Sequence, residues 1–308
     1  MSESVCDSNV ENLLPSVVVL LAAYNGITYI EQQLQSILQQ KNVNVTVFIS
    51  VDLSSDNTYE WCLSFAKQYL NINVLPYGER FGSAAPNFFR LIKDVNFLNF
   101  DYLAFSDQDD VWFLDKLSHG IKQMEIANAE AYSASVIAFW EDGTERLIDK
   151  SQPQREFDYL FEAAGPGCTY IYTHKAASLI KEYLNTFPEL NDFVLHDWLA
   201  YAILRHKNYI WFIDSVPKMY YRQHDLNQVG ANFSFKGKVS RMYYILSGQA
   251  FGSIKLLANV LEIPSIQMTS RMGVFKLALK ARQLRRRRIE RFLAFIALIS
   301  YAILGPHT

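Results

Sequence analysis

The chain has 308 residues, half of them hydrophobic, with 21 Phe, 18 Tyr and 5 Trp. This composition excludes a disordered chain, and the length is enough to bury one large core or two smaller ones. The net charge of −2 is unevenly distributed: the stretch from Lys276 to Arg291 carries +7 and the remainder −9, which predicts a separate anionic partner for that stretch.

The N-terminus and the cysteines bear on the cellular compartment. Residues 1–15 contain three acidic residues and no basic one, the opposite of a signal peptide, so we expect a flexible N-terminus without an export signal. Cys6, Cys62 and Cys168 are odd in number and far apart, which predicts neither a disulfide framework nor a zinc site. A reducing, cytosolic environment fits both observations.

Two strand-turn-helix units follow one another at the start of the globular part. Residues 16–23 are a continuous apolar run, typical of a parallel strand covered on both faces. Residues 28–38 have helical spacing, and their first four residues have the pattern of a capping box. Residues 43–51, rich in β-branched side chains, and the helical pattern of residues 61–69 repeat the unit. This succession predicts a right-handed, mostly parallel α/β sheet.

Ligands of such a sheet bind outside the carboxyl ends of its strands. We therefore expect Ala23, Tyr24 and Asn25, after the first strand, to share one edge with Asp52, after the second. Asp52 either accepts hydrogen bonds from a nucleotide base or ribose or has a structural role. Asp56 is more simply interpreted as a helix N-cap.

An acidic stretch follows the short apolar run of residues 102–105. Asp107, Gln108, Asp109 and Asp110 come at the predicted carboxyl end of this strand. Clustered carboxylates repel one another unless a cation neutralises them, and Mg²⁺ binds through one or two carboxylates together with substrate phosphates. The alternative is a solvated acidic turn that caps the next helix.

The middle of the chain offers weaker signals. Arg80 is either a phosphate contact or an ordinary surface arginine. Residues 133–148 contain two strand patterns around an Asp-Gly turn, which predicts a hairpin that adds an antiparallel edge to the parallel sheet. Gly167 precedes a strand pattern at residues 169–172 and either lets a ligand approach the backbone or forms a plain turn.

Two further clusters combine acidic or basic groups with apolar neighbours. His196, Asp197 and Trp198 begin a predicted helix, where Asp197 is either a cap or a carboxylate with a raised pKa that accepts a proton. Arg222 and His224 are two residues apart after a strand and so share one face, where together they could bind a diphosphate and a metal.

The C-terminal part is helical in pattern from Ser247. Its basic run is followed by residues 292–304, an almost purely apolar stretch that as a helix spans only ~20 Å, against ~30 Å for a bilayer core. A basic stretch beside a short apolar helix is typical of a protein lying on an anionic membrane surface. Nucleic acid is the rival partner, but the apolar run would not help to bind it. We therefore expect membrane contact through Lys276–Leu304 and no nucleic acid.

Several of these motifs together resemble the inverting glycosyltransferases of family two, which have the GT-A fold. The sequence around Asp107 and His224 is most similar to that of the bacterial rhamnosyltransferases of that family. The resemblance covers roughly residues 16 to 230. The segments that carry it are residues 21–26, 52–56, 106–112, 196–198 and 221–224.

The resemblance implies a GT-A catalytic domain over residues 16–245, a Rossmann-like and mostly parallel sheet with helices on both faces. From the basic and apolar runs, and not from the resemblance, we expect a C-terminal helical segment over residues 246–308 that associates with the membrane. The protein would move a sugar, possibly rhamnose, from a nucleoside-diphosphate sugar to a growing lipid-linked or surface polysaccharide. It would be cytoplasmic and peripheral on the inner face of the cell membrane. The alternative is a non-catalytic sugar-nucleotide-binding or scaffold protein of a polysaccharide assembly complex.

The resemblance also implies roles for single residues. Asp109 and His224 would hold Mg²⁺ or Mn²⁺, Asp197 would be the catalytic base, and the acceptor would lie near His196 and Trp198. One departure concerns Asp52, since Val51 and Leu53 flank it where the family usually has Asp-Asp-Gly. The residues expected at the donor are Ala23, Tyr24, Asn25, Asp52, Arg80, Asp107, Gln108, Gly167 and Arg222.

Overall fold

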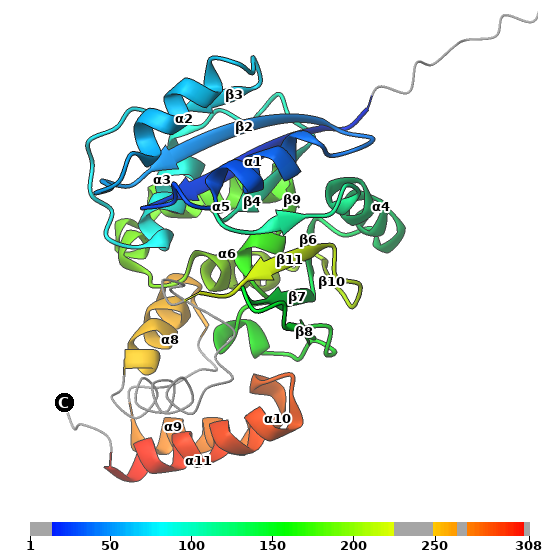
Figure 1. Ribbon diagram of the computed structural model, residues 1–308. Helices are drawn as coiled ribbons and strands as arrows, with labels where there is room; N and C mark the ends of the chain where they lie inside the picture. Colours follow the sequence, from blue (N-terminus) through cyan, green and yellow to red (C-terminus); the bar gives the residue numbers. More distant parts are fainter. Residues whose placement is uncertain (1–13, 225–248, 264–269, 305–308) are drawn as a thin grey trace, which may run out of the picture.

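The computed structural model describes residues 14–224, 249–263 and 270–304 (Figure 1). The predicted boundary between residues 245 and 246, and most of the predicted N-terminal segment, lie outside these residues. The elements in chain order are β1 (Ser16–Ala23), α1 (Ile30–Leu38), β2 (Asn44–Val51), α2 (Thr58–Ala66), β3 (Ile72–Val74), α3 (Ala84–Asp94), β4 (Tyr102–Ser106), β5 (Val111–Trp112), α4 (Lys116–Ala127), β6 (Ala131–Ala134), β7 (Val136–Phe139), β8 (Glu145–Ile148), the 3₁₀ helices η1 (Asp158–Leu160) and η2 (Gly167–Thr169), β9 (Ile171–Thr173), α5 (His174–Thr186), η3 (Pro188–Asp192), α6 (His196–His206), β10 (Trp211–Asp214), β11 (Met219–Arg222), α8 (Gln249–Val260), α9 (Arg271–Leu279), α10 (Ala281–Leu284) and α11 (Arg288–Leu304).

The main sheet has seven strands in the order β10-β6-β9-β4-β1-β2-β3. β1 pairs in parallel with both β2 and β4, and β9 runs antiparallel between β4 and β6. The predicted mostly parallel α/β sheet is therefore confirmed. β1 is covered on both faces because its side chains alternate between two hydrophobic clusters, with Val18 and Leu20 in one and Val19 and Leu21 in the other.

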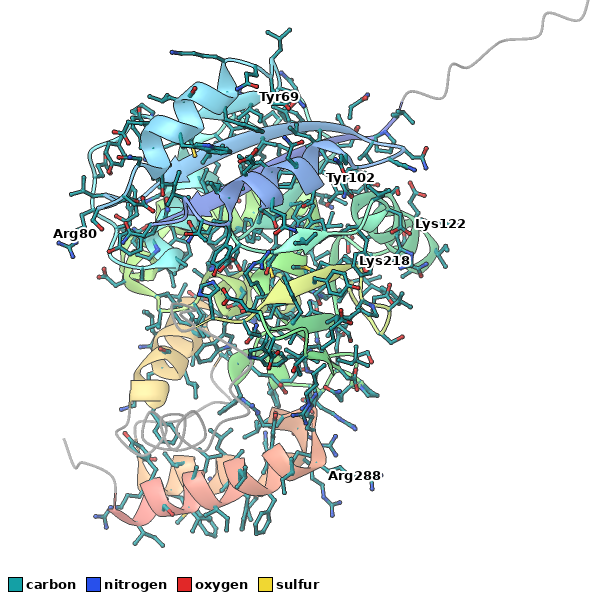
Figure 2. The ribbon with its side chains drawn as sticks, viewed as in Figure 1. Tyr69, Arg80, Tyr102, Lys122, Lys218 and Arg288 are labelled. Carbon is teal, nitrogen blue, oxygen red and sulfur yellow. The ribbon has the colours of Figure 1, made fainter. Side chains whose placement is uncertain are left out.

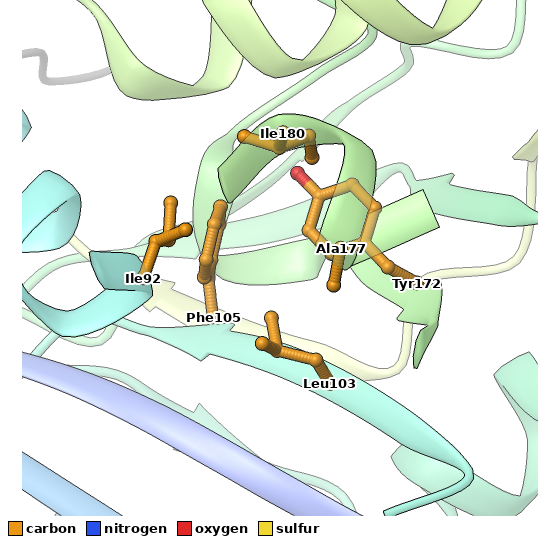
Figure 3. Close-up of a pocket in the computed structure, with 6 residues that line it drawn as sticks. All are labelled: Ile92, Leu103, Phe105, Tyr172, Ala177 and Ile180. Atoms are coloured by element: carbon orange, nitrogen blue, oxygen red, sulfur yellow. The ribbon is translucent and has the colours of Figure 1, made fainter. Parts of the chain in front are cut away.

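Helices cover both faces of this sheet. Buried residues of α1, α2 and α4 belong to the same cluster as Val19, and those of α3, α5 and α6 belong to the same cluster as Val18. Between α3, α5 and β4 there is a small apolar pocket within the core (Figure 3), lined by Ile92, Leu103, Phe105, Tyr172, Ala177 and Ile180. All six side chains are buried, so this pocket is part of the packing and not a ligand site.

A second, four-stranded sheet has the order β5-β11-β7-β8. The predicted Asp-Gly hairpin forms between β7 and β8, but it lies in this second sheet, and the expectation that it extends the parallel sheet is wrong. The sequence pattern can predict the local pairing of β7 with β8. It cannot predict the sheet to which the hairpin belongs, because the other neighbour of β7 is β11, more than eighty residues further along the chain.

The predicted capping box at the start of α1 is also wrong. The helix begins at Ile30, and its N-cap residue is Tyr29, which makes no capping hydrogen bond with its side chain. The Tyr29 hydroxyl instead donates to Glu141 in the β7–β8 turn, 3.0 Å away. The side chain at the N-cap position thus makes a long-range contact and no local capping bond.

The C-terminal helices lie beyond the second sheet, at the opposite end of the molecule from β3 (Figure 1). Their buried side chains, among them Leu277, Leu284 and Leu298, belong to the same hydrophobic cluster as α6. Arg286 is 3% exposed and lies 3.4 Å from Glu162, so part of the basic run is internal to the protein. Among the described residues, no helix has the length and apolar composition required to span a bilayer.

Candidate active site

The carboxyl ends of β1 and β4 are joined by one side chain. The Gln108 amide donates to the Tyr24 carbonyl and accepts from the Tyr24 N–H, at 2.8 Å each. Gly26 allows this clamp, because a Cβ at that position would lie 2.1 Å from Gln108 Oε1. Gln108 thus holds the turn that leaves Tyr24 about half exposed at the predicted ligand-binding edge.

The turn after β1 is also tied to the turn after β2. Asn25 adopts a left-handed conformation with φ +46°, and its side-chain oxygen accepts from the Ser55 N–H at 2.8 Å. Asp56 accepts hydrogen bonds from the Thr58 N–H at 3.0 Å and from the Ile27 N–H at 3.2 Å. The N-cap residue of α2 is Asn57, so the prediction that Asp56 is the N-cap is wrong by one residue, although Asp56 does bond the first N–H of the helix. Ala23, at the end of β1, is buried, and its carbonyl accepts from the Asp52 N–H.

Asp52 positions the loop that carries Arg80. Its carboxylate accepts from the backbone N–H groups of Phe81 and Gly82, both at 2.8 Å, and from that of Leu53 at 2.7 Å. These bonds support the structural alternative for Asp52, while its contact with a nucleotide base stays a prediction. Arg80 points away from the molecule at its edge (Figure 2).

The three carboxylates of the acidic stretch lie in a poorly solvated cluster. Burial, followed by the charge of Asp109, raises the pKa of Asp107 to about 7, and burial raises the pKa of Asp110 as well. Asp110 is fully buried, and one of its carboxylate oxygens has no hydrogen-bond partner among the described residues. Oxygens of Asp107 and Asp110 and the sulfur of Cys168 lie within 4.8 Å of one another.

Lys116 lies beneath this cluster. It is 2% exposed, and its ammonium sits over the Trp112 ring, 3.4 Å from the ring centroid. Burial lowers its pKa to about 7, while the nearby Cys168 and Asp110 act in the opposite direction. A lysine with so low a pKa offsets the buried negative charge only in part, so the acidic cluster still favours a cation.

The two predicted metal ligands are adjacent. His224 Nε2 lies 2.7 Å from Asp109 Oδ2, and the His224 ring stacks on Tyr29 with centroids 5.1 Å apart. A neutral imidazole and a carboxylate are both ligands that Mn²⁺ accepts. The group of three potential ligands that lie within 4.8 Å of one another, among the described residues, is the neighbouring Asp107, Asp110 and Cys168. The donor set at this edge therefore fits a divalent cation.

Arg222 holds the backbone of Asp109 in place. Its Nε donates to the Asp109 carbonyl at 2.7 Å and its Nη2 to Gln32 Oε1 at 2.5 Å. The guanidinium lies between the rings of Tyr29 and Phe139, 4.6 Å and 4.5 Å from their centroids. With 9% of its surface exposed, Arg222 has a positioning role, and its contact with the donor stays a prediction.

Asp197 lies at the first turn of α6, next to Gly167. A Cβ on Gly167 would lie 3.2 Å from Asp197 Cβ and 2.4 Å from His196 Nε2, so only glycine fits there without displacing α6. Asp197 Oδ1 accepts from the Trp198 N–H at 2.7 Å. Burial raises the pKa of Asp197 to about 6, offset by that hydrogen bond and by the charge of Lys150. A carboxylate with this pKa is suited to accept a proton near neutral pH.

The neighbours of Asp197 pack into the core. His196 stacks on Phe88, with centroids 3.9 Å apart, and burial lowers its pKa to about 3, so its ring is neutral. Trp198 is 5% exposed, and its indole donates to the Tyr159 carbonyl at 2.9 Å. Trp198 thus belongs to the main core, whereas His196 is partly buried, and a contact of either ring with the acceptor stays a prediction.

The sequence interpretation missed Gln32, Tyr29, Lys116 and Cys168. For Cys168 a signal was available, since it directly follows Gly167. Lys116 lies only four residues after Trp112, but Trp112 is in β5 and Lys116 begins α4, so no helical spacing marks their contact. Nothing local marks Gln32 or Tyr29, whose partners are Arg222 and His224, far along the chain.

A GT-A-like sheet with a carboxylate-rich edge is the architecture of enzymes that use nucleotide sugars. The model of the family described as glycosyl transferase family 2 matches residues 18–185, and the chain belongs to this family. It is 43% identical over 285 residues to the dTDP-rhamnosyl transferase RfbG of Shigella flexneri, covering 91% of this chain and 99% of that relative. The predicted family and the resemblance to rhamnosyltransferases are confirmed, and the protein is a nucleotide-sugar glycosyltransferase.

Two solved structures confirm the fold. The S. aureus TarS fragment 1–349 in complex with UDP-GlcNAc matches with a TM-score of 0.56 and 13% identity, covering 94% of this chain and 92% of that one. The mannosyltransferase PcManGT from Pyrobaculum calidifontis, in complex with GDP-Man and Mn²⁺, matches with a TM-score of 0.50 and 15% identity, covering 96% and 91%. At these identities the likeness concerns the fold alone.

Proposed function

We propose that the protein transfers rhamnose, with inversion, from a dTDP-activated donor to a growing lipid-linked or surface glycan. The observation that carries this proposal is the 43% identity to a dTDP-rhamnosyl transferase over nearly the whole of that relative. The half-exposed Tyr24 and the edge at Asp52 and Asp107 are the proposed donor site, with Gly167 beside the sugar. A nucleoside diphosphate is the leaving group, and inversion follows from a single in-line displacement at the anomeric carbon.

Asp197 is the proposed general base. It takes the proton of the acceptor hydroxyl on the face of the sugar opposite the leaving nucleoside diphosphate, and attack from that face inverts the anomeric carbon. Gly167 lets the start of α6, with this carboxylate, pack closely against its backbone, and His196 fixes the position of α6 through its stacking on Phe88. Inversion therefore depends on a single carboxylate at the start of α6.

Asp107 and Asp109 are the proposed ligands of Mg²⁺ or Mn²⁺, with His224 as a further ligand. When bound, such an ion neutralises negative charge on the diphosphate. Arg222 and Gln32 act indirectly by holding the Asp109 backbone. The relative with bound Mn²⁺ supports the choice of ion, and the repulsion within the acidic cluster supports the need for one.

The donor proposal predicts a clear preference in a panel of nucleotide sugars. With Mn²⁺ present and a membrane fraction as the source of acceptor, release of the nucleoside diphosphate should be fastest with dTDP-rhamnose. UDP-GlcNAc and GDP-mannose are the controls. A non-catalytic sugar-nucleotide-binding protein would bind a donor without release, so binding without turnover of any donor would contradict an enzymatic role. Faster release from another sugar would exclude rhamnose only.

Membrane association through Lys276–Leu304 is the proposed location, on the cytoplasmic face of the cell membrane. One face of α9 and one of α11 expose apolar side chains, while their other faces pack into the protein. Exposed apolar surface beside basic residues suits the interface of an anionic bilayer. The exposed apolar residues are Met272, Phe275, Leu279, Ile289, Phe292, Leu293, Ile296 and Ile303.

Replacing Phe292 and Ile296 with serine should therefore weaken binding to phosphatidylglycerol-containing vesicles by at least tenfold, since burying each side chain contributes roughly 1.5–3 kcal/mol. Co-sedimentation of the full chain measures the effect. These side chains are 61% and 46% exposed, so the thermal unfolding midpoint should change little. Leu63→Ser, on the distant α2, is the control. Unchanged vesicle binding by the double variant would contradict docking through α11.

A further inference from the structure

An arginine cluster lies where the C-terminal helices meet the body of the protein. The Phe157 N–H donates to the Gln283 carbonyl at 3.0 Å, which brings the segment of Arg155 against α10. Arg291, on α11, donates from Nε and Nη2 to the carbonyls of Arg285 and Arg286 at 2.9 and 2.6 Å. The cluster consists of Arg155, Arg282, Arg288 and Arg291, and we refer to these four residues as the seam arginines.

The seam arginines are close enough to affect one another. Desolvation, followed by the charges of Arg155, Arg288 and Arg282, lowers the pKa of Arg291. Like charges gathered in this way destabilise the folded protein unless anions offset them. Arg155 also has an unsatisfied donor, because its Nε is buried and has no hydrogen-bond partner among the described residues.

The nearby carboxylates are engaged elsewhere. Glu290 pairs with Arg285 at 2.8 Å, Glu162 with Arg286 at 3.4 Å, and Asp158 with Arg205 at 3.3 Å. In the part of the chain that the structure describes, no ion pair within 4.0 Å involves a seam arginine. The buried arginines thus hold the C-terminal helices to the body, while the seam arginines retain an excess of positive charge.

Position then indicates which anion fits. Arg282 and Arg288 are exposed, and Figure 2 shows Arg288 at the outer edge of α11. Phe292, one helical turn from Arg288, is 61% exposed, and Ile289 is 66% exposed. A guanidinium binds a phosphate through two parallel hydrogen bonds, and exposed apolar side chains beside it would enter the acyl region of a lipid layer. Nucleic acid would match the charge but leave the apolar side chains in water.

We propose that the seam arginines bind the headgroup phosphates of an anionic lipid surface, so that the protein docks with this seam against the membrane. The inference rests on the proposed docking through α9 and α11 and adds a defined site for the phosphates. On this proposal the preference for anionic lipids comes from these four residues. It does not come from the basic stretch as a whole, because part of that stretch is internal to the protein.

The test compares Arg282→Gln/Arg288→Gln with the charge-matched control Lys67→Gln/Lys122→Gln, whose lysines are exposed just after α2 and on α4. Full-length proteins are co-sedimented with vesicles of phosphatidylcholine alone or mixed with phosphatidylglycerol. At ~1 kcal/mol per basic residue, the arginine variant should bind the mixed vesicles roughly 30-fold more weakly than the wild type. The control should match the wild type, and on phosphatidylcholine alone all three should bind equally.

Equal losses in both double variants would overturn the proposal, because the effect would then follow net charge. Undiminished binding by the arginine variant would overturn it too, and would leave docking through the apolar faces intact. A wild type that binds neither vesicle would overturn docking itself. Displacement by inorganic phosphate or by duplex DNA at matched ionic strength would assign the site to a free phosphate or to nucleic acid. Titration with dTDP and the unfolding midpoint verify that the variants are folded.

Discussion

Replacing Asp197 with asparagine should lower the rate of sugar transfer by roughly 10²- to 10⁴-fold, the range associated with removal of a general base. Asparagine keeps the size of the side chain, and its oxygen can still accept the hydrogen bond from the Trp198 N–H. Affinity for the donor should therefore stay near that of the wild type. Single-turnover transfer and titration with dTDP measure the two quantities separately.

The control for this variant is Asp192→Asn, which removes an exposed carboxylate from η3, just before α6. It should transfer sugar at the wild-type rate. Near-normal transfer by Asp197→Asn would rule out the base role. A loss of donor binding together with a lower unfolding midpoint would identify Asp197 as a structural carboxylate.

The pH dependence of the transfer rate is a second test of the role of Asp197. Because burial raises the pKa of Asp197 to about 6, its carboxyl is ionised above that pH and protonated below it. Only the ionised form can accept a proton, so the rate should fall by about tenfold per pH unit below pH ~6. With Mn²⁺ and donor saturating, so that protonation of Asp107 does not limit the rate, this acidic limb should be absent in Asp197→Asn, since asparagine does not titrate.

The sequence was sufficient for the βα units but not for the order of the sheet. β1 could be recognised from its uninterrupted apolar run, because burial on both faces removes the alternation that marks other strands. β9 could not be placed, since its antiparallel position between β4 and β6 depends on pairings with strands about 40 and 70 residues away. The second sheet escaped prediction for the same reason, because its parallel contact joins β7 to β11.

The residues of the candidate site also differ in how far the sequence alone could mark them. Asp107, Asp109 and Asp197 could be selected from the sequence because carboxylates are unusual beside apolar runs. Their supporting partners could not, because the hydrogen bond from Arg222 to Asp109 spans 113 residues. Candidate site residues are thus visible in a sequence when they conflict with their surroundings. The positioning role of a residue such as Arg222 cannot be predicted in this way, because its partners are distant in the sequence.

Asp109→Asn should remove most of the benefit that Mg²⁺ or Mn²⁺ gives to donor binding. The asparagine oxygen can still accept from His224 Nε2, which lies 2.7 Å from the carboxylate, and Arg222 bonds the unchanged backbone carbonyl. The local fold should therefore persist while one negative ligand is lost. We expect dTDP affinity in saturating Mn²⁺ to fall by at least tenfold, a change measurable by calorimetry. Without metal, wild type and variant should bind dTDP with similar, weak affinity.

The matched control is Asp101→Asn, which alters a carboxylate just before the same strand, β4, at the opposite edge of the sheet. It should bind dTDP and Mn²⁺ like the wild type. Equal affinity of the wild-type protein for dTDP with and without metal would refute the metal site at Asp109. A metal effect that survives in Asp109→Asn but is lost in Asp107→Asn would instead assign the ion to Asp107.

The two carboxylates also differ in their surroundings. Burial, followed by the charge of Asp109, raises the pKa of Asp107 to about 7, whereas Asp109 bonds directly to His224. Occupation of the site by a cation should therefore release a proton from Asp107 near neutral pH, and the heat of Mn²⁺ binding should depend on the ionisation enthalpy of the buffer.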